Sequence, residues 1–328
     1  MGEHMECWEK QFVRLLFPYS AKRLNVGHAY MLKERHIPQK LYKYRNFNKY
    51  HMQALRDGVL WLSAPEHFND PYDSAIYFDS RGFLTENLSV EEAIARTEAQ
   101  VTPSDIAQAW EQRDLANPIR KDELFAKIHE ELLRDFPESV RSALETAIED
   151  IQRQTNLDLT SRMTALSRNG MSVLSLSENP VSALMWAHYS DSHRGFCVEY
   201  DFGSLGADDF RRRFCYPVLY RRKITNATRY LAFKKRDDFN NLFGKLLCLL
   251  KSDEWAYERE WRIVHATGPD QANRAMGMPR PSTVILGCHT RDKDRKTLMS
   301  ICGALGIEVT QVRQQQEAFR FEIVKAGK

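Results

Sequence analysis

The sequence predicts an α+β fold, a mixed and largely antiparallel sheet with surrounding helices and a helical insertion. Two regions with different spacing of their apolar residues indicate this. Residues 88–166 are charged and carry apolar side chains at helical spacing, whereas from Met171 onward apolar and polar side chains alternate as in strands. We therefore expect an N-terminal lead-in over 1–38, a core domain formed by 39–87 and 167–328, and a helical insertion over 88–166.

The first elements of the core are predicted to be a strand, a helix and a second strand. Residues 40–45 alternate as a strand does, and residues 49–57 have the pattern of a helix. Gly58 ends that helix, because glycine readily adopts the left-handed backbone found at helix C-termini. Residues 59–63 are apolar and predict the second strand.

The insertion is expected to contain amphipathic helices. Its apolar side chains recur at helical intervals in two stripes, one at Leu124, Ile128 and Leu132 and the other at Val140, Leu144, Ile148 and Ile151.

The second part of the core is predicted to be rich in strands. Residues 172–177 and 196–201 each alternate and are expected to be half-buried, with Ser175 and Ser177 on the face opposite Leu174 and Leu176. The remaining elements expected are strands over 261–264, 283–286 and 319–323, with a helix over 291–305 between the last two.

Composition limits the classes of function. The net charge of +3 is too small for a dedicated nucleic-acid binder. The six cysteines are widely spaced, which is typical of free thiols in a reducing compartment. Since there is no apolar run of about 18 residues and no secretion signal, we expect a cytoplasmic protein without a membrane partner.

Four short motifs combine polar and aromatic side chains that suit a binding site. Each motif also has a structural explanation: residues 68–71 as a turn, 177–180 as a helix cap, 185–189 as a core anchor and 257–262 as a salt-bridged strand. If the last motif opens a strand, Glu258, Glu260 and Arg262 project from one face, an arrangement suited to acid–base chemistry. The motifs are Phe68-Asn69-Asp70-Pro71, Ser177-Glu178-Asn179-Pro180, Met185-Trp186-Ala187-His188-Tyr189 and Tyr257-Glu258-Arg259-Glu260-Trp261-Arg262.

These motifs, together with Leu41-Tyr42-Lys43-Tyr44-Arg45 and Gly195-Phe196-Cys197, resemble a widespread bacterial family classified as a domain of unknown function. The resemblance runs from about residue 40 to 290, with the motifs in the same order. It brings no established reaction with it.

The chain is also loosely similar to ADP-ribosyltransferases of the arginine, serine, glutamate type. That similarity implies NAD as a substrate, with Arg45 or Lys43 on its pyrophosphate. Glu260 would hydrogen-bond the ribose 2′-hydroxyl and stabilise an oxocarbenium ion, and Glu258 would orient the acceptor. The other side chains expected to bind NAD are Ser175 and Ser177 at the nicotinamide ribose, Trp186 or Tyr189 stacked on a ring, and His188, Asn69 and Asp70.

The resulting hypothesis is an NAD-dependent ADP-ribosyltransferase or NAD glycohydrolase, acting as a toxin or phage-defence effector on a macromolecular acceptor. Two alternatives stay open. One is a metal-dependent hydrolase of nucleotides or nucleic acid that uses Asp70, Asp73, His188 and Glu178. The other is a non-catalytic ligand sensor or partner-binding module with a pocket lined by Trp186, Tyr189 and Trp261.

Overall fold

The computed structural model describes residues 5–78, 170–231, 239–267 and 274–326, and single positions between 138 and 165. The chain divides into two compact units, one formed by 1–75, 165–224 and 237–328 and the other by 76–164 and 225–236. The described positions between 138 and 165 are helical. Both predicted apolar stripes lie outside the described residues, and the division into lead-in, core and insertion stays a prediction.

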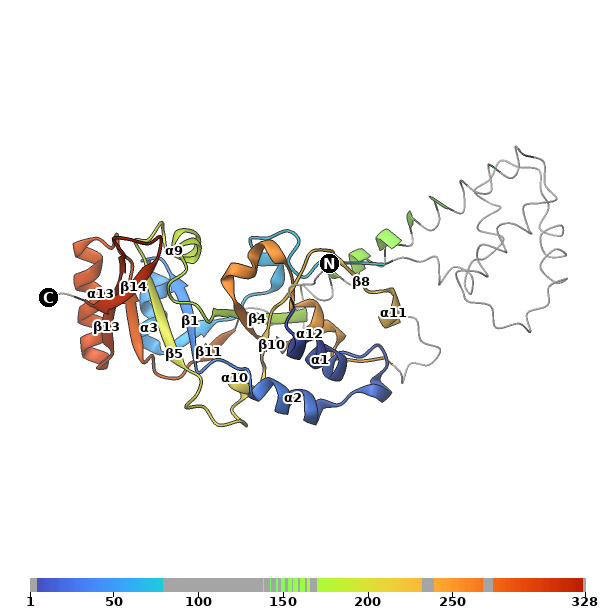
Figure 1. Cartoon of the computed structure of the whole chain (residues 1–328), viewed down its shortest axis with the longest axis horizontal. Coiled ribbons are helices and arrows are strands. Elements are labelled where there is room, and N and C mark those ends of the chain that lie inside the picture. The colour runs from blue at the N-terminus through green and yellow to red at the C-terminus, as the bar shows by residue number, and fades with distance from the viewer. Residues whose placement is uncertain are drawn as a thin grey trace. The chain divides into compact units, whose positions relative to one another are not determined.

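The first unit is built on an eight-stranded sheet with the strand order β14-β13-β12-β5-β1-β4-β10-β6 (Figure 1). Neighbouring strands are antiparallel except for the parallel pair β12–β13, which confirms a mixed, largely antiparallel sheet. The strands are β1 (Lys40–Arg45), β4 (Met171–Ser177), β5 (Phe196–Asp201), β6 (Cys215–Pro217), β10 (Glu260–Ala266), β12 (Thr283–Leu286), β13 (Glu308–Gln314) and β14 (Phe321–Lys325).

Smaller sheets and helices complete the two units. In the first unit, β2 (Val59–Trp61) pairs with β11 (Ala275–Gly277) and β7 (Leu219–Arg221) with β9 (Leu250–Ser252). Its helices are α1 (Cys7–Leu16), α2 (Val26–Glu34), α3 (Lys49–Asp57), α9 (Ala183–Tyr189), α10 (Phe210–Arg213), α12 (Phe243–Leu247) and α13 (Asp292–Leu305), with 3₁₀ turns η1 (Ala21–Arg23), η2 (Pro65–His67) and η4 (Asp253–Glu258). The second unit contains β3 (Ile76–Tyr77), β8 (Thr225–Asn226) and α11 (Thr228–Leu231). No helix in the described ranges is both long and apolar enough to cross a membrane.

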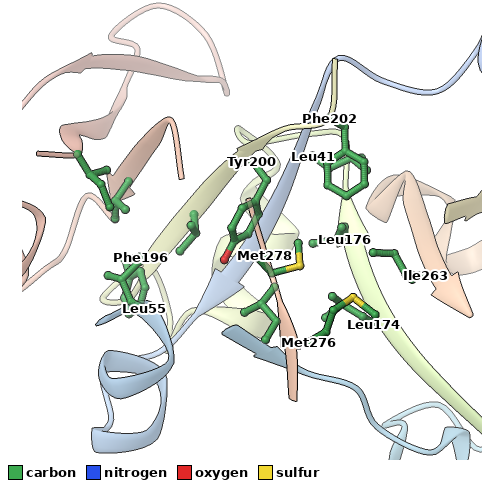
Figure 2. Close-up of a cluster of buried hydrophobic side chains, with 14 of the residues drawn as sticks. Leu41, Leu55, Leu174, Leu176, Phe196, Tyr200, Phe202, Ile263, Met276 and Met278 are labelled. Carbon is green, nitrogen blue, oxygen red and sulfur yellow. The ribbon is translucent and has the colours of Figure 1, made fainter. Parts of the chain in front are cut away.

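The large sheet is covered on both faces. One face carries a cluster that includes Leu41, Leu174 and Phe196 (Figure 2). A second cluster joins Cys197 of β5 to Trp186 of α9. Residues 196–200 are therefore all buried, and the prediction of a half-buried strand over 196–201 is wrong, because hydrophobic side chains pack on both faces of β5.

The first predicted elements are confirmed with one difference of length. β1 and α3 have the predicted bounds, and Gly58 ends α3 with φ of 64°. The α3 N-terminus is capped by Asn48, whose side chain accepts a hydrogen bond from the His51 amide at 2.7 Å. β2 ends at Trp61 rather than at residue 63, because Ser63 exchanges backbone hydrogen bonds with Val173 of β4 instead.

Candidate functional site

The first unit contains a cavity of about 630 Å³, within the size range of small-molecule sites. Side chains from β1, β4, β10, α3, α9 and the segment 63–73 line it. The predicted site residues that line this cavity are Lys43, Arg45, Asn69, Ser175, Ser177, His188, Tyr189, Glu258 and Glu260.

Two of the residues predicted to bind NAD, Trp186 and Asp70, lie outside the cavity lining, as do Trp261 and Glu178 of the alternative hypotheses. Trp186 is fully buried, its indole N–H donates to the Pro180 carbonyl at 2.9 Å, and its ring meets the Tyr44 ring edge-on with centroids 5.1 Å apart. Trp186 is thus a core anchor without an exposed ring face. Asp70 accepts a hydrogen bond from the Tyr72 amide at 2.9 Å, which closes the predicted turn.

The sheet register aligns the serine strand with the start of β10. Ser177 is opposite Glu260, and Ser175 is opposite Arg262. The Ser177 hydroxyl donates to the Glu258 carbonyl at 2.6 Å, so it holds the end of η4 against β4. Residues 177–180 do not cap α9, because the N-cap of that helix is Ser182, whose hydroxyl accepts a hydrogen bond from the Met185 amide.

The motif over 257–262 is not a continuous strand. Glu258 is the last residue of η4, Arg259 has a left-handed backbone with φ of 44°, and β10 begins only at Glu260. The prediction that Glu258 and Glu260 project from one face of a strand is therefore wrong. The two carboxylates nevertheless meet, because the same lysine binds both.

That lysine is Lys251 of β9, and it belongs to a buried network of three carboxylates and two cations. Its Nζ lies 2.5 Å from Glu258 Oε2, 3.0 Å from Glu260 Oε2 and 3.9 Å from Asp73 Oδ2. Arg262 donates to both oxygens of Asp73, at 2.8 and 2.6 Å, and to both oxygens of Glu260, at 2.8 and 2.9 Å. The salt-bridged alternative for this motif is correct in its pairing, but the pair is buried and not exposed.

The network shifts the pKa values of its two glutamates in opposite directions. Burial, followed by the neighbouring charge of Glu260, raises the pKa of Glu258 above its ordinary value. Burial acts in the same direction on Glu260, but the charges of Arg262 and Lys251 outweigh it and hold the pKa of Glu260 far below its ordinary value. The network therefore favours the ionised form of Glu260, and Glu258 is the glutamate that binds a proton more readily.

The β1 side of the cavity carries two cations. The Lys43 ammonium donates to the Ser175 carbonyl at 2.6 Å. Burial, followed by the charge of Arg45, lowers the pKa of Lys43 to about 7. Within the described part of the chain, the Arg45 guanidinium makes no hydrogen bond and no ion pair. Two half-buried cations without a carboxylate partner are a natural anion site.

The Tyr189 hydroxyl joins two of the predicted motifs to Glu258. It donates to Glu258 Oε1 at 2.7 Å and accepts a hydrogen bond from Asn69 Nδ2 at 3.3 Å. Sequence reasoning found these three residues but not Lys251, which lies in no motif. Its only signal in the sequence is its place seven positions before Glu258.

The residues proposed for a metal site do not converge. Both oxygens of Asp73 are bound by Arg262, and Glu178 lies 3.5 Å from Arg259. Among the residues that the structure describes, no group of three or more His, Cys, Asp or Glu side chains is placed to hold a metal ion.

Fold and site define an α+β domain with a charged, partly enclosed cavity. A family model described as "Protein of unknown function (DUF2971)" matches residues 185–263. This confirms the resemblance to a family of domains of unknown function, and the matched segment includes His188, Tyr189, Glu258 and Glu260. No curated protein and no solved structure matches the chain.

Proposed function

We propose that the protein cleaves the nicotinamide–ribose bond of NAD, as an ADP-ribosyltransferase or an NAD glycohydrolase. The observation that carries the proposal is that one cavity is lined both by basic and by acidic side chains. The basic ones are Lys43 and Arg45, neither of which forms an ion pair with a carboxylate among the described residues, and the acidic ones are Glu258 and Glu260. NAD needs both kinds of group. Its pyrophosphate is an anion, and its nicotinamide ribose becomes an oxocarbenium ion as the bond breaks.

The cationic side suits the pyrophosphate. A guanidinium presents several N–H donors in a rigid plane and binds phosphate oxygens in pairs, which makes Arg45 the main anchor. Lys43 adds a second positive charge from the same strand. Because no protein carboxylate neutralises Arg45 in the described chain, a bound phosphate would gain the full attraction of this charge.

The anionic side suits the developing positive charge on the ribose. Glu260 stays ionised because Arg262 and Lys251 bind it, so a negative charge is already in place when the oxocarbenium ion forms. Glu258 has the raised pKa of a general base and suits proton removal from the attacking nucleophile. Nicotinamide leaves as a neutral ring and needs no acid.

The sheet order supports the similarity to ADP-ribosyltransferases of the arginine, serine, glutamate type. That scheme needs residues from three separate strands in one pocket. β1 with Arg45, β4 with Ser175 and β10 with Glu260 are consecutive in the sheet, although about 125 residues separate β1 from β4 in sequence. An NAD-consuming activity suits a toxin or phage-defence effector in the bacterial cytoplasm, and this is the setting we propose.

The test is nicotinamide release from NAD by the purified full-length protein, with and without a bacterial extract as a source of acceptors. We expect release that is lost in Glu260→Gln and in Arg45→Gln, and retained in Glu322→Gln, whose carboxylate pairs with Arg313 outside the cavity. Arg45→Gln is the stricter variant, because the Arg45 guanidinium makes no hydrogen bond and no ion pair within the described part of the chain that the substitution would break. Absence of nicotinamide release from a folded protein would refute the proposal. Hydrolysis of nucleotides or nucleic acid that a chelator abolishes, without nicotinamide release, would favour the metal-dependent hydrolase.

A further inference from the structure

The hydroxyl of Tyr189 is hydrogen-bonded to Glu258, the glutamate proposed as the general base. Tyr189 lines the cavity, is only partly buried, and its hydroxyl donates to Glu258 Oε1 at 2.7 Å. Asn69 Nδ2 donates to the Tyr189 hydroxyl oxygen at 3.3 Å and fixes the direction of that hydroxyl. A hydroxyl within hydrogen-bond reach of a carboxylate, and itself held by a third group, has the geometry of an activated nucleophile.

The other described tyrosines of the cavity lack this arrangement. Tyr42 also donates to a carboxylate, Glu199, at 2.8 Å, but Glu199 does not line the cavity and is also bound by Lys40 and Ser282. The Tyr44 hydroxyl donates to a backbone carbonyl, and Tyr50 is largely exposed to solvent. A solvated or backbone-bonded phenol has no base to receive its proton.

The serine hydroxyls of the cavity are also less suited. Ser177 donates to the Glu258 backbone carbonyl at 2.6 Å, which cannot accept a proton. Ser175 hydrogen-bonds the side chain of Glu260, whose charge is stabilised by Arg262 and which is therefore a weak base. Glu258 is the stronger base of the two glutamates, and Tyr189 is the hydroxyl that its side chain binds.

Resting on the proposed function, we propose that Tyr189 is the first acceptor of the ADP-ribosyl group and forms a covalent tyrosyl–ADP-ribose. Tyr189 Oη attacks the anomeric carbon of the nicotinamide ribose, and the C–O bond forms as the C–N bond breaks. Nicotinamide leaves as a neutral ring with the electron pair of that bond. The phenolic proton passes to Glu258 Oε1, so the pyridinium charge and the carboxylate charge disappear together.

The electrostatics of Tyr189 and Glu258 favour transfer of the phenolic proton while the new C–O bond forms and not before it. Burial, followed by the charge of Glu258, raises the pKa of Tyr189, so a free phenolate does not form beforehand. The proton must move as the new bond forms, which is general-base catalysis. Lys251, 2.5 Å from Glu258 Oε2, favours the ionised form of this carboxylate and so opposes the effect of burial on its pKa. A tyrosine nucleophile is known chemistry for the cleavage of a glycosidic bond, as in sialidases.

The experiment is mass spectrometry of the full-length protein after incubation with NAD and rapid acid quenching. A second reaction uses an NAD analogue with fluorine at the ribose 2′ position, which slows adduct breakdown by destabilising the oxocarbenium ion. We expect one added ADP-ribosyl group, located on the peptide that carries Tyr189, and its loss in Tyr189→Phe. The control is Tyr30→Phe, which likewise removes a part-buried tyrosine hydroxyl, and with it the 2.7 Å Tyr30–Tyr216 hydrogen bond, but outside the cavity.

The outcomes separate this inference from the proposed function. Nicotinamide release without an adduct at Tyr189 in either reaction, or with an unchanged rate in Tyr189→Phe, overturns the role of Tyr189 and leaves the proposed function standing. An adduct on another residue also overturns it. No nicotinamide release from the wild-type protein overturns both.

Discussion

The ammonium group of Lys251 joins the two glutamates of the cavity, lying 2.5 Å from Glu258 Oε2 and 3.0 Å from Glu260 Oε2. The Lys251 side chain is only 4% exposed, so water cannot take its place. A buried charge that loses its partner is costly, because the remaining charge is neither solvated nor paired. Lys251 therefore determines both the stability of the site and the ionisation of Glu258.

Replacing Lys251 with methionine removes this charge while keeping most of the side-chain volume. We expect Lys251→Met to lose about 3–5 kcal/mol of unfolding free energy, measured by urea denaturation at neutral pH. Lys251→Arg should lose less, because it keeps the charge. The control is Lys40→Met, which breaks the 2.8 Å pair with Glu199; the Lys40 side chain is 53% exposed, and such pairs contribute about 0–1 kcal/mol. Equal losses in Lys251→Met and Lys40→Met would contradict this account of the network.

Gly195 allows the backbone of β1 to approach the loop before β5. A Cβ at position 195 would lie 2.1 Å from the Arg45 carbonyl oxygen and 2.8 Å from Ser190 Cβ, far inside van der Waals contact. We expect Gly195→Ala to lower the melting temperature and to weaken anion binding, because the backbone of Arg45 must shift. The loss of unfolding free energy should be about 1–3 kcal/mol, as for other overpacked sites.

A glycine in the same unit provides the comparison for Gly195. Gly303 lies inside α13, and a Cβ there meets nothing within 4 Å. Since glycine is less favourable than alanine inside a helix by roughly 0.5–1 kcal/mol, Gly303→Ala should be neutral or stabilising. If both alanine variants melt at the wild-type temperature, the close approach at Gly195 does not matter for stability.

Trp61 and Tyr50 line the cavity yet remain exposed, at 57% and 71%. Aromatic rings that stay exposed at a ligand cavity are suited to stacking on a planar base, such as the adenine of NAD. We expect Trp61→Ala to weaken ADP-ribose binding by about 1–3 kcal/mol in calorimetry, and ADP-ribose to quench the fluorescence of Trp61. Phe319→Ala, another exposed aromatic but outside the cavity lining, should bind normally. Unchanged affinity in Trp61→Ala would exclude stacking on this ring.

Much of the sheet could be predicted from local patterns, because alternation and glycine stops act over a few residues. β1, α3 and β12 follow such patterns closely. The cavity charges could be predicted less well, since their meaning depends on partners far away in sequence. Asp73 and Arg262 are 189 positions apart, and no local pattern shows that they pair. Nor does the sequence reveal the left-handed backbone of Arg259, a conformation that an arginine seldom adopts.

Lys43 makes stability depend on pH in a direction that can be worked out. Burial and then the charge of Arg45 lower its pKa to about 7 in the folded protein, from an ordinary 10.5. Between these two values the unfolded chain binds a proton that the folded chain does not, so unfolding free energy rises with pH by up to about 1.4 kcal/mol per pH unit. Below pH 7 both states are protonated, and the full destabilisation is present. Lys43→Met should lack this rise, so the wild-type curve should be the steeper one between pH 7 and 9 in urea denaturation; parallel curves would contradict the lowered pKa.

The same titration should appear in anion binding with the opposite sign. A bound pyrophosphate favours the charged form of Lys43, so ADP-ribose affinity should fall as pH rises above 7, by at most about tenfold per pH unit. Lys43→Arg keeps a positive charge over this whole range, because a guanidinium does not lose its proton there. Its affinity should therefore vary less with pH between 7 and 9 than that of the wild-type protein. If calorimetry shows the same pH dependence in both proteins, Lys43 does not contact the anion, and Arg45 alone holds it.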